Sequence, residues 1–136
     1  ALVYGRRCAL EIEAALGPRC GPAPDVILPD LAAAPPPDAA LVRQLRRTMT
    51  DGVGVIRDAI GLQRALTEIA RIEAAQPDCA SLRNMTATAT LIAAAALARQ
   101  ESRGAHFRAD FPDTNGETGA RSLLTLADAV SRPCPT

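Results

Sequence analysis

The stretch DAIGLQRALTEIARIEAA, residues Asp58–Ala75, carries the clearest helical pattern in the chain. Its apolar residues recur at the spacing that places them along one face of an α-helix, and they are Leu62, Ala65, Leu66, Ile69 and Ile72. On the opposite, solvated face, Glu68 can pair with Arg64 or Arg71. Because proline cannot continue a helix, the segment Gln76-Pro77-Asp78 ends it. We therefore predict an amphipathic helix that buries one face against neighbouring helices.

The flanking sequence predicts two further helices. Asp38 is a plausible N-cap for a helix that runs to about Met49 along an apolar stripe of Leu41, Val42, Leu45 and Met49. The glycines of Asp51-Gly52-Val53-Gly54 then interrupt it, and they mark a turn or a close approach of backbones. On the other side, Ser81 is expected to cap a helix over Leu82–Arg103, with its apolar set at Leu82, Met85, Ala89, Ile92 and Ala96. This helix is apolar nearly all round at Ala93–Ala96, so we expect it to be the central one.

The rest of the chain is organised around this bundle. Residues Leu2–Leu16 read as a leading helix, and seven prolines between Gly17 and Pro37 indicate a linker. Within the linker, Val26-Ile27-Leu28 fits a short extended segment. We expect four parts: residues 1–16 as a leading helix, 17–37 as the linker, 38–112 as the bundle domain and 113–136 as a loop-like tail. The predicted fold class is all-α, a small helical bundle of three main helices plus the leading helix, with a long Pro-rich linker and an extended C-terminal segment.

Composition narrows the class of protein. Hydrophobic residues make up 48% of the 136-residue chain but aromatic residues only 2%, so a core of Ala, Leu, Ile and Val is expected. Fifteen basic residues, all of them Arg, balance fifteen acidic ones. A net charge near zero offers no field for nucleic acid or an anionic membrane. No apolar run approaches the ~20 residues that a membrane span needs. We therefore expect no nucleic-acid partner and no membrane partner.

The four cysteines are Cys8, Cys20, Cys79 and Cys134, and they lie far apart with no CxxC pair. A zinc site needs closely spaced ligand pairs, and the chain has a single histidine. A chain of this length also has little need of disulfides. We predict free thiols, no metal site and a cytoplasmic protein.

The segment Glu101–Pro112, ESRGAHFRADFP, follows the last predicted helix. It breaks at Gly104 and then alternates, with polar residues on one face of an extended run and Phe107, Ala109 and Phe111 on the other. The pattern predicts that the helix ends at a glycine with left-handed backbone and is followed by a short, charged, half-buried strand that packs on a neighbouring surface.

Several residue groups have side chains or spacings that suit ligand binding or catalysis. Gly52-Val53-Gly54 lacks the third glycine and the preceding strand of a dinucleotide-binding loop, so a packing turn is the favoured interpretation. Arg99, Arg103 and Arg108 have the chemistry to bind a dicarboxylate, although arginines near a helix C-terminus are also favoured by the helix dipole. An acid–base cluster in Glu101–Pro112 would want a second histidine or a nucleophile, and none is nearby. We predict no catalytic, cofactor-binding or metal-binding residue, and interdomain docking by Arg103, His106, Arg108 and Asp110.

The segment ESRGAHFRADFP resembles a signature near the end of flavoproteins of the succinate dehydrogenase, fumarate reductase and L-aspartate oxidase group. Ala1-Leu-Val-Tyr-Gly5 resembles the end of that family's flavin-contacting helix. The stretch Leu45–Arg57 resembles the entry into its carboxy-terminal helical domain, and Leu82-Arg-Asn84 the start of its central helix. The resemblance implies that this chain is the helical domain at the end of such a flavoprotein, with residues 1–16 as the tail of a flavin-domain helix.

Within the group, the tail is the distinguishing part. The chain lacks Trp, and Phe-Pro-Asp113-Thr followed by Ser122–Leu126 is more similar to L-aspartate oxidases than to the other members. That resemblance implies a parent enzyme that uses FAD to oxidise L-aspartate to iminoaspartate, with oxygen or fumarate as electron acceptor, on the way to quinolinate and NAD. Its flavin and substrate sites would lie outside this chain, which would be inactive alone and would dock on the flavin-binding domain of the same parent chain. Two alternatives stay open: the equivalent domain of a succinate dehydrogenase or fumarate reductase flavoprotein subunit, and a helical interaction module without an enzymatic parent.

Overall fold

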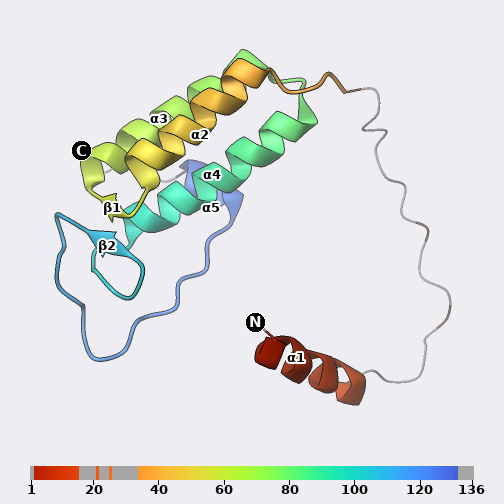
Figure 1. Cartoon of the computed structure of the whole chain (residues 1–136), viewed down its shortest axis with the longest axis vertical. Helices are drawn as coiled ribbons and strands as arrows, with labels where there is room; N and C mark the ends of the chain where they lie inside the picture. Colours follow the sequence, from red (N-terminus) through yellow and green to blue (C-terminus); the bar gives the residue numbers. More distant parts are fainter. Residues whose placement is uncertain (1, 16–20, 22–24, 26–33, 132–136) are drawn as a thin grey trace.

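The computed structural model describes residues 2–15, 21, 25 and 34–131 (Figure 1). Three helices pack together: α2 (Ala39–Val53), α3 (Ala59–Ala75) and α4 (Ala80–Ala98). A leading helix, α1 (Leu2–Ala15), and a short one, α5 (Leu126–Ser131), complete the helices of the described residues. The strands β1 (Ile56–Arg57) and β2 (Phe107–Arg108) pair in parallel at one end of the bundle. The all-α prediction is confirmed, whereas most of the predicted linker, including Val26-Ile27-Leu28, lies outside the described residues.

The core lies along α3, which packs extensively on both α2 and α4. The predicted stripe of α3 is confirmed: four of its five members are buried, and Leu66 is partly buried against them. Leu62 and Ile69 have no exposed surface. We expected α4 to be the central helix, but α3 takes that place because α2 and α4 contact each other less than either contacts α3. The residues of the core cluster are Leu45, Val53, Leu62, Ala65, Ile69, Ile72, Cys79, Leu82, Ala89, Ala93 and Ala96.

Helix α2 begins where the sequence predicted but ends later. The Asp38 carboxylate accepts a hydrogen bond from the Ala40 backbone N–H at 2.6 Å, so Asp38 is the N-cap. The helix then continues past Met49 to Val53, and Gly52 lies inside it. A Cβ at Gly52 would stand 2.9 Å from the carbonyl oxygen of Gly61 on α3. Gly52 therefore allows two backbones to approach closely, and the helix turns away only after Val53.

Helix α4 differs from its prediction at both ends. Its N-cap is Cys79, whose Sγ accepts the Leu82 backbone N–H at 3.4 Å, and Ser81 lies inside the helix. The helix ends at Ala98 rather than Arg103, because Arg99 adopts an extended backbone. The predicted apolar face is also partly wrong: Ile92 is exposed, and Thr86 is buried instead. The Thr86 hydroxyl donates to the Glu73 carboxylate, which explains how a polar residue is accommodated there.

The tail after Pro112 was expected to be loop-like, yet it contains α5. The Thr125 backbone N–H donates to the Asp128 carboxylate at 3.1 Å, and the Asp128 backbone N–H donates to the Thr125 hydroxyl at 3.2 Å. This reciprocal pair is a capping box, and the sequence Thr125-Leu-Ala-Asp128 was the signal that could have predicted it. Ala129 is buried where α5 packs on α4.

Two further predictions concern the chain as a whole. Cys8, which is exposed, and Cys79, which is buried, are free thiols as expected, while Cys20 and Cys134 lie outside the described residues. None of the described helices combines the length and the apolar character needed to cross a membrane.

Candidate functional site

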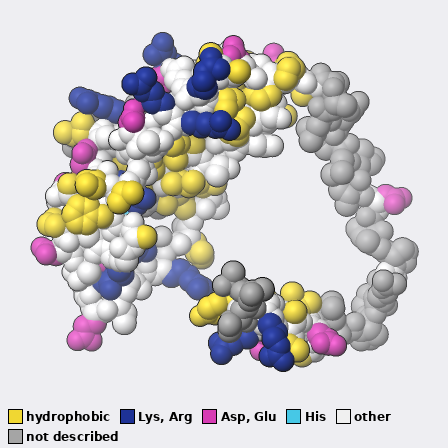
Figure 2. Space-filling view, in the orientation of Figure 1, with side chains coloured by type: hydrophobic (Ala, Val, Ile, Leu, Met, Phe, Trp, Pro, Cys, Tyr) yellow, Lys and Arg dark blue, Asp and Glu magenta, His cyan; other side chains and the backbone are white. Residues whose placement is uncertain are grey.

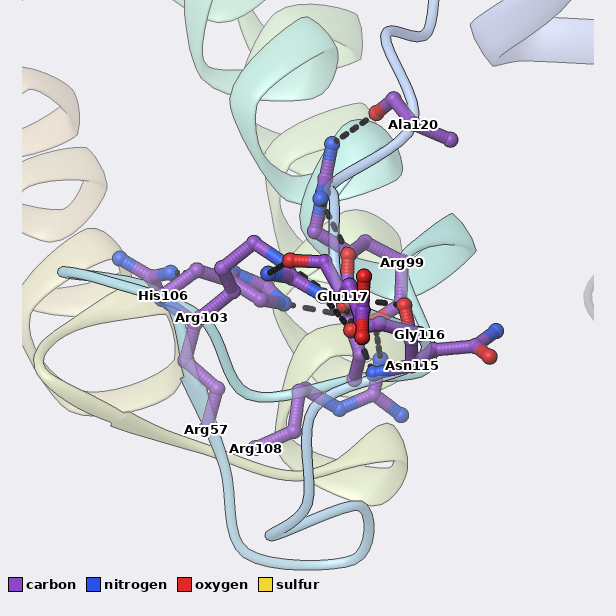
Figure 3. Close-up of polar contacts among 10 residues, drawn as sticks. Arg57, Arg99, Arg103, His106, Arg108, Asn115, Gly116, Glu117 and Ala120 are labelled. Carbon is purple, nitrogen blue, oxygen red and sulfur yellow. Dashed lines mark hydrogen bonds and ion pairs between the residues drawn. The ribbon is translucent and has the colours of Figure 1, made fainter.

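A network of polar side chains lies at the end of the bundle that carries β1 and β2 (Figure 3). The parallel pairing brings Ile56 opposite Phe107 and Arg57 opposite Arg108. Two arginines that are far apart in the sequence therefore lie side by side. Each of them binds the C-terminal end of a different helix, as the following contacts show.

Arg108 is the most deeply buried charged residue of the described chain, with 1% of its surface exposed. One terminal nitrogen of its guanidinium, Nη1, donates to the backbone carbonyls of Ala96, Leu97 and Arg99, at 2.9, 3.0 and 3.1 Å. The last carbonyls of a helix have no partner within it, so Arg108 supplies donors where α4 leaves acceptors. Its positive charge also suits the negative end of the helix dipole. The ring of Phe111 lies 5.0 Å from the guanidinium carbon.

Asp110 completes this cap and extends it to a second helix. Its two carboxylate oxygens accept from Nε and Nη2 of Arg108, each at 2.7 Å, which is the paired geometry that makes such contacts strong. The same carboxylate accepts the backbone N–H of Ala59, at the start of α3, at 3.0 Å. The hydrogen bonds from Arg108 lower the pKa of Asp110 to about 2. One ion pair thus joins the C-terminal end of α4 to the N-terminal end of α3, with each charge at the helix end that favours it.

Arg57 does for α2 what Arg108 does for α4. Its Nε donates to the carbonyls of Val53 and Gly54, at 3.2 and 2.8 Å. Its Nη1 lies 2.8 Å from Nδ1 of His106. A guanidinium can only donate, so Nδ1 accepts, and the ring proton belongs on Nε2, which faces the Arg99 carbonyl at 3.3 Å. Burial, together with the positive charges of the nearby arginines, lowers the pKa of His106, so the ring is neutral at physiological pH.

Glu101 organises the loop that follows the network. Its buried carboxylate accepts from Arg99, from Nε of Arg103 at 3.0 Å and from the Asn115 backbone N–H at 3.0 Å. The Asn115 hydrogen bond, followed by that of Arg103, lowers the pKa of Glu101. Arg103 also donates to the carbonyls of Asn115 and Gly116, at 2.9 and 2.8 Å. Arg99 reaches the Ala120 carbonyl at 2.8 Å (Figure 3), so residues 113–120 are held against the end of α4.

With this geometry in view, the comparisons with known proteins identify the family. Residues 42–132 match the family described as the fumarate reductase flavoprotein C-term. The chain belongs to this family. It is 52% identical, over 98% of its length, to an L-aspartate oxidase of Rhodospirillum rubrum, and covers 48% of that protein. It is 46% identical, over 93% of its length, to an L-aspartate oxidase of Caulobacter vibrioides, and covers 22% of it. The chain thus spans less than half the length of these relatives.

A solved structure shares the fold of this flavoprotein C-terminal domain. It is described as Mycobacterium smegmatis Sdh1 in complex with UQ1, and it is 26% identical to this chain with a TM-score of 0.54. The match covers 81% of this chain and 20% of the other. The match therefore concerns one part of that longer chain.

The structure brings the four predicted docking residues into one network, although not in the predicted form. Arg103, His106, Arg108 and Asp110 all bind partners within the domain, and β2 is only two residues long. Gly104 has the expected left-handed backbone, with φ of 58°. It lies in a turn closed by backbone hydrogen bonds between Arg103 and His106, and not at the end of α4. Docking of these residues on another domain stays a prediction.

Three members of the network were not predicted as site residues, namely Arg57, Arg99 and Glu101. Arg57 had no local signal, because its role depends on strand pairing with a distant segment. Arg99 and Glu101 did have a local signal, because an acidic residue between nearby arginines predicts ion pairs among them. The dicarboxylate site considered for Arg99, Arg103 and Arg108 is filled by the protein itself, with the carboxylates of Glu101 and Asp110 as the bound groups.

The glycine-containing turn at this end of the bundle does not have the position of a phosphate-binding loop. Gly52-Val53-Gly54 lies at the carbonyl end of α2, and Arg57 covers those carbonyls, whereas phosphates bind at helix N-termini. In the part of the chain that the structure describes, no three His, Cys, Asp or Glu side chains gather as a metal site would require. The network joins three helix ends by hydrogen bonds: the C-terminal ends of α2 and α4 and the N-terminal end of α3.

A separate groove of about 970 Å³ runs between α3 and α4 beside α5. Ala94 and Leu97 of α4 line it from one side, Leu66 and Ala70 of α3 from the other, and Val130 of α5 borders it. It lies along the helices, on a face that the arginine network does not form.

Proposed function

We propose that this chain is the C-terminal helical domain of an FAD-dependent L-aspartate oxidase. The observation that carries the proposal is the 52% identity with the Rhodospirillum rubrum L-aspartate oxidase over 98% of the chain. The parent enzyme would oxidise L-aspartate to iminoaspartate and pass the electrons to oxygen or fumarate, a step that leads to quinolinate and NAD. FAD and the substrate would be held by the part of the parent outside this chain. The free thiols of Cys8 and Cys79 support a cytoplasmic location.

The role of the domain itself is structural. Residues 38–112 form the bundle, residues 17–37 link it to the preceding part, and residues 113–136 are a tail of which residues 113–120 are tied back by the Glu101 network. Residues 1–16 belong to a helix of the flavin-binding domain, which is supported by the exposure of Tyr4 and Ile12 on α1. The domain docks on the flavin-binding domain of the same chain through the segment that contains Arg103, His106, Arg108 and Asp110. Their bonds within the domain fix the shape of that segment.

The second candidate is the equivalent domain of a succinate dehydrogenase or fumarate reductase flavoprotein subunit. The likeness to the Sdh1 structure favours it, but at 26% identity that likeness is well below the identity to the two L-aspartate oxidases. The choice between the two decides the substrate of the parent, not the architecture of this domain.

The deciding experiment is a turnover assay on the full-length parent, purified with its flavin. We expect reduction of the flavin by L-aspartate, followed by formation of hydrogen peroxide under air or of succinate when fumarate is supplied. Succinate with an artificial electron acceptor is the matched alternative substrate. Turnover with succinate and none with L-aspartate would overturn the proposal in favour of the second candidate. A parent that holds no flavin and oxidises neither compound would favour a non-enzymatic module.

A further inference from the structure

The β1–β2 pair has its polar side chains inside and its apolar side chains outside. Arg57 and Arg108 lie opposite each other and point to the helix ends, where they cap α2 and α4. Ile56 and Phe107 are also opposite each other, and alternation along a strand sends them to the other face. That face is the outer one, since 69% of Ile56 and 41% of Phe107 are exposed. The usual arrangement for a strand pair with one solvated face is the reverse.

Two further exposed apolar side chains adjoin the strand pair. Val55 directly precedes β1 and is 80% exposed, and Ile60 in the first turn of α3 is 62% exposed. The bond from the Ala59 N–H to Asp110 holds the turn after β2 against the start of α3, so Ile60 lies next to the strand pair. We name Val55, Ile56, Ile60 and Phe107 the outer patch. Figure 2 shows hydrophobic side chains gathered over the end of the bundle where β1 and β2 lie.

Single exposed apolar residues are ordinary on protein surfaces, but a cluster of large ones usually marks an interaction site. The outer patch is such a cluster, and the residues beneath it are fixed. Arg57 and Arg108 are held by eight hydrogen bonds to carbonyls at the helix ends, to His106 and to Asp110. A preorganised apolar surface loses little conformational entropy when a partner covers it. These two properties are those of a docking surface.

We propose that the outer patch packs against the preceding part of the same polypeptide, the flavin-binding part of the parent. This rests on the proposed function. The lengths of the relatives support the flavin-binding part as the partner of the outer patch. The chain covers 22% of the Caulobacter vibrioides relative and 48% of the Rhodospirillum rubrum one, so most of each relative lies outside the matched region. A tethered neighbour is also present at a high effective concentration, which favours it over a separate partner for the same apolar surface.

The residues of the segment Glu101–Pro112 then have two different roles. Phe107 makes the contact with the neighbouring domain, together with Ile56 from β1. Arg108, Asp110 and His106 lie beneath and hold the strand pair in place. The docking role predicted for the charged residues is thereby a positioning role, and the contact itself is apolar.

The first test is thiol footprinting on the full-length flavoprotein with its cofactor. Phe107→Cys and Ile56→Cys place a thiol in the outer patch, and Leu123→Cys, at a position 88% exposed outside it, is the matched control. A maleimide reagent is followed by mass spectrometry of the peptide that contains each site, so the natural cysteines do not interfere. We expect labelling at positions 56 and 107 to be slower in the native protein than in urea, on the order of tenfold or more. The Leu123→Cys variant should label rapidly in both conditions.

The second test identifies what covers the patch. A photoreactive benzoylphenylalanine replaces Phe107 in the full-length protein, and the cross-linked peptides are sequenced. We expect links to peptides of the same polypeptide that precede the region described here. Links between two copies of the protein, or to a different protein, would overturn the proposal. So would native labelling at positions 56 and 107 that is as fast as labelling in urea.

Neither test involves a substrate, so the outcomes separate the two proposals. A protected patch in a protein that does not oxidise L-aspartate would leave the docking proposal standing and remove the proposed function. Oxidation of L-aspartate by a protein whose outer patch labels freely would do the opposite. If Phe107→Cys fails to fold, Ile56→Cys decides the footprint, since position 56 is more exposed and carries no network bond.

Discussion

Replacing Arg108 by Met tests the idea that this buried arginine holds the helix ends together. Methionine keeps the length of the side chain and can lie beside Phe111, but it has no donors. The carbonyls of Ala96, Leu97 and Arg99 then lose their hydrogen bonds from the side chain, and the Asp110 carboxylate loses both of its hydrogen bonds from the guanidinium. The change therefore leaves four groups without this partner.

The expected cost follows from the burial of these groups. Breaking a buried ion pair by removing one partner destabilises a protein by about 3–5 kcal/mol. The Asp110 side chain is 30% exposed, so water can partly replace Arg108 there, and we expect a loss near the lower end, about 3 kcal/mol. Arg47→Met is the matched control, because Arg47 pairs with Asp51 at 3.5 Å with side chains 85% and 67% exposed. Exposed pairs contribute less than about 1 kcal/mol, and the control should lose no more than that.

The assay is urea unfolding of the 136-residue chain, followed by far-ultraviolet circular dichroism. Arg108→Lys belongs in the series, because lysine keeps the charge but lacks the planar fork that binds Asp110 and the carbonyls together, so its cost should be intermediate. Equal losses in Arg108→Met and Arg47→Met, at the same slope of free energy against urea, would refute the reasoning. The network would then be a set of surface contacts with no role in joining the helices.

Three other changes have defined expectations. Because burial lowers the pKa of His106 below 6.5, the unfolded chain takes up a proton at a higher pH than the folded chain, and stability should fall as the pH drops below about 6.5. Asparagine at this position can still accept the hydrogen bond from Arg57 but does not titrate. The urea midpoint of His106→Asn should therefore depend less on pH between pH 7 and 5. Ala93→Leu should cost roughly 1–3 kcal/mol by overpacking a fully buried site, whereas Ala95→Leu on the exposed face of the same helix should change the unfolding free energy by less than about 0.5 kcal/mol. Gly52→Ala should destabilise despite a gain in helix propensity of about 1 kcal/mol, because its Cβ would stand 2.9 Å from a backbone oxygen of α3; a raised melting temperature would contradict this.

Local signals explain what the sequence could predict. Helix α3 was predicted at nearly its observed bounds because its apolar stripe is encoded within the helix itself, and the structure adds Asp58 as its N-cap. The buried face of α4 was harder to predict, because a helix rich in alanine is apolar on almost every side. The sequence pattern then does not determine which side faces the core. The spacing of the apolar residues predicts that Ile92 is buried, but the structure buries Thr86, whose hydroxyl is satisfied by Glu73 and by the Arg83 carbonyl.

The ends of helices depended on distant residues, and these were missed. Helix α4 ends at Ala98, where Arg108 donates hydrogen bonds to its last backbone carbonyls. The sequence of residues 99–103 alone does not predict that end. Ser81 was predicted as the cap of α4, whereas the structure uses the thiol of Cys79, which is a weaker acceptor than a hydroxyl. The candidate site shows the same limit: its charged residues were recognised in Glu101–Pro112, whereas the pairing with Arg57 required the fold.

The capping role of the arginines explains the direction of the outer patch, but not its composition. Because Arg57 and Arg108 must point inward to reach the ends of α2 and α4, the residues that precede them, Ile56 and Phe107, must point outward. Any residue that favours extended backbone would satisfy that geometry, and threonine would do so without exposing a large apolar surface. Isoleucine and phenylalanine at these two positions add nothing to the caps. Their presence requires a second cause outside the domain, and a covering surface in the rest of the parent chain is a cause of the right kind.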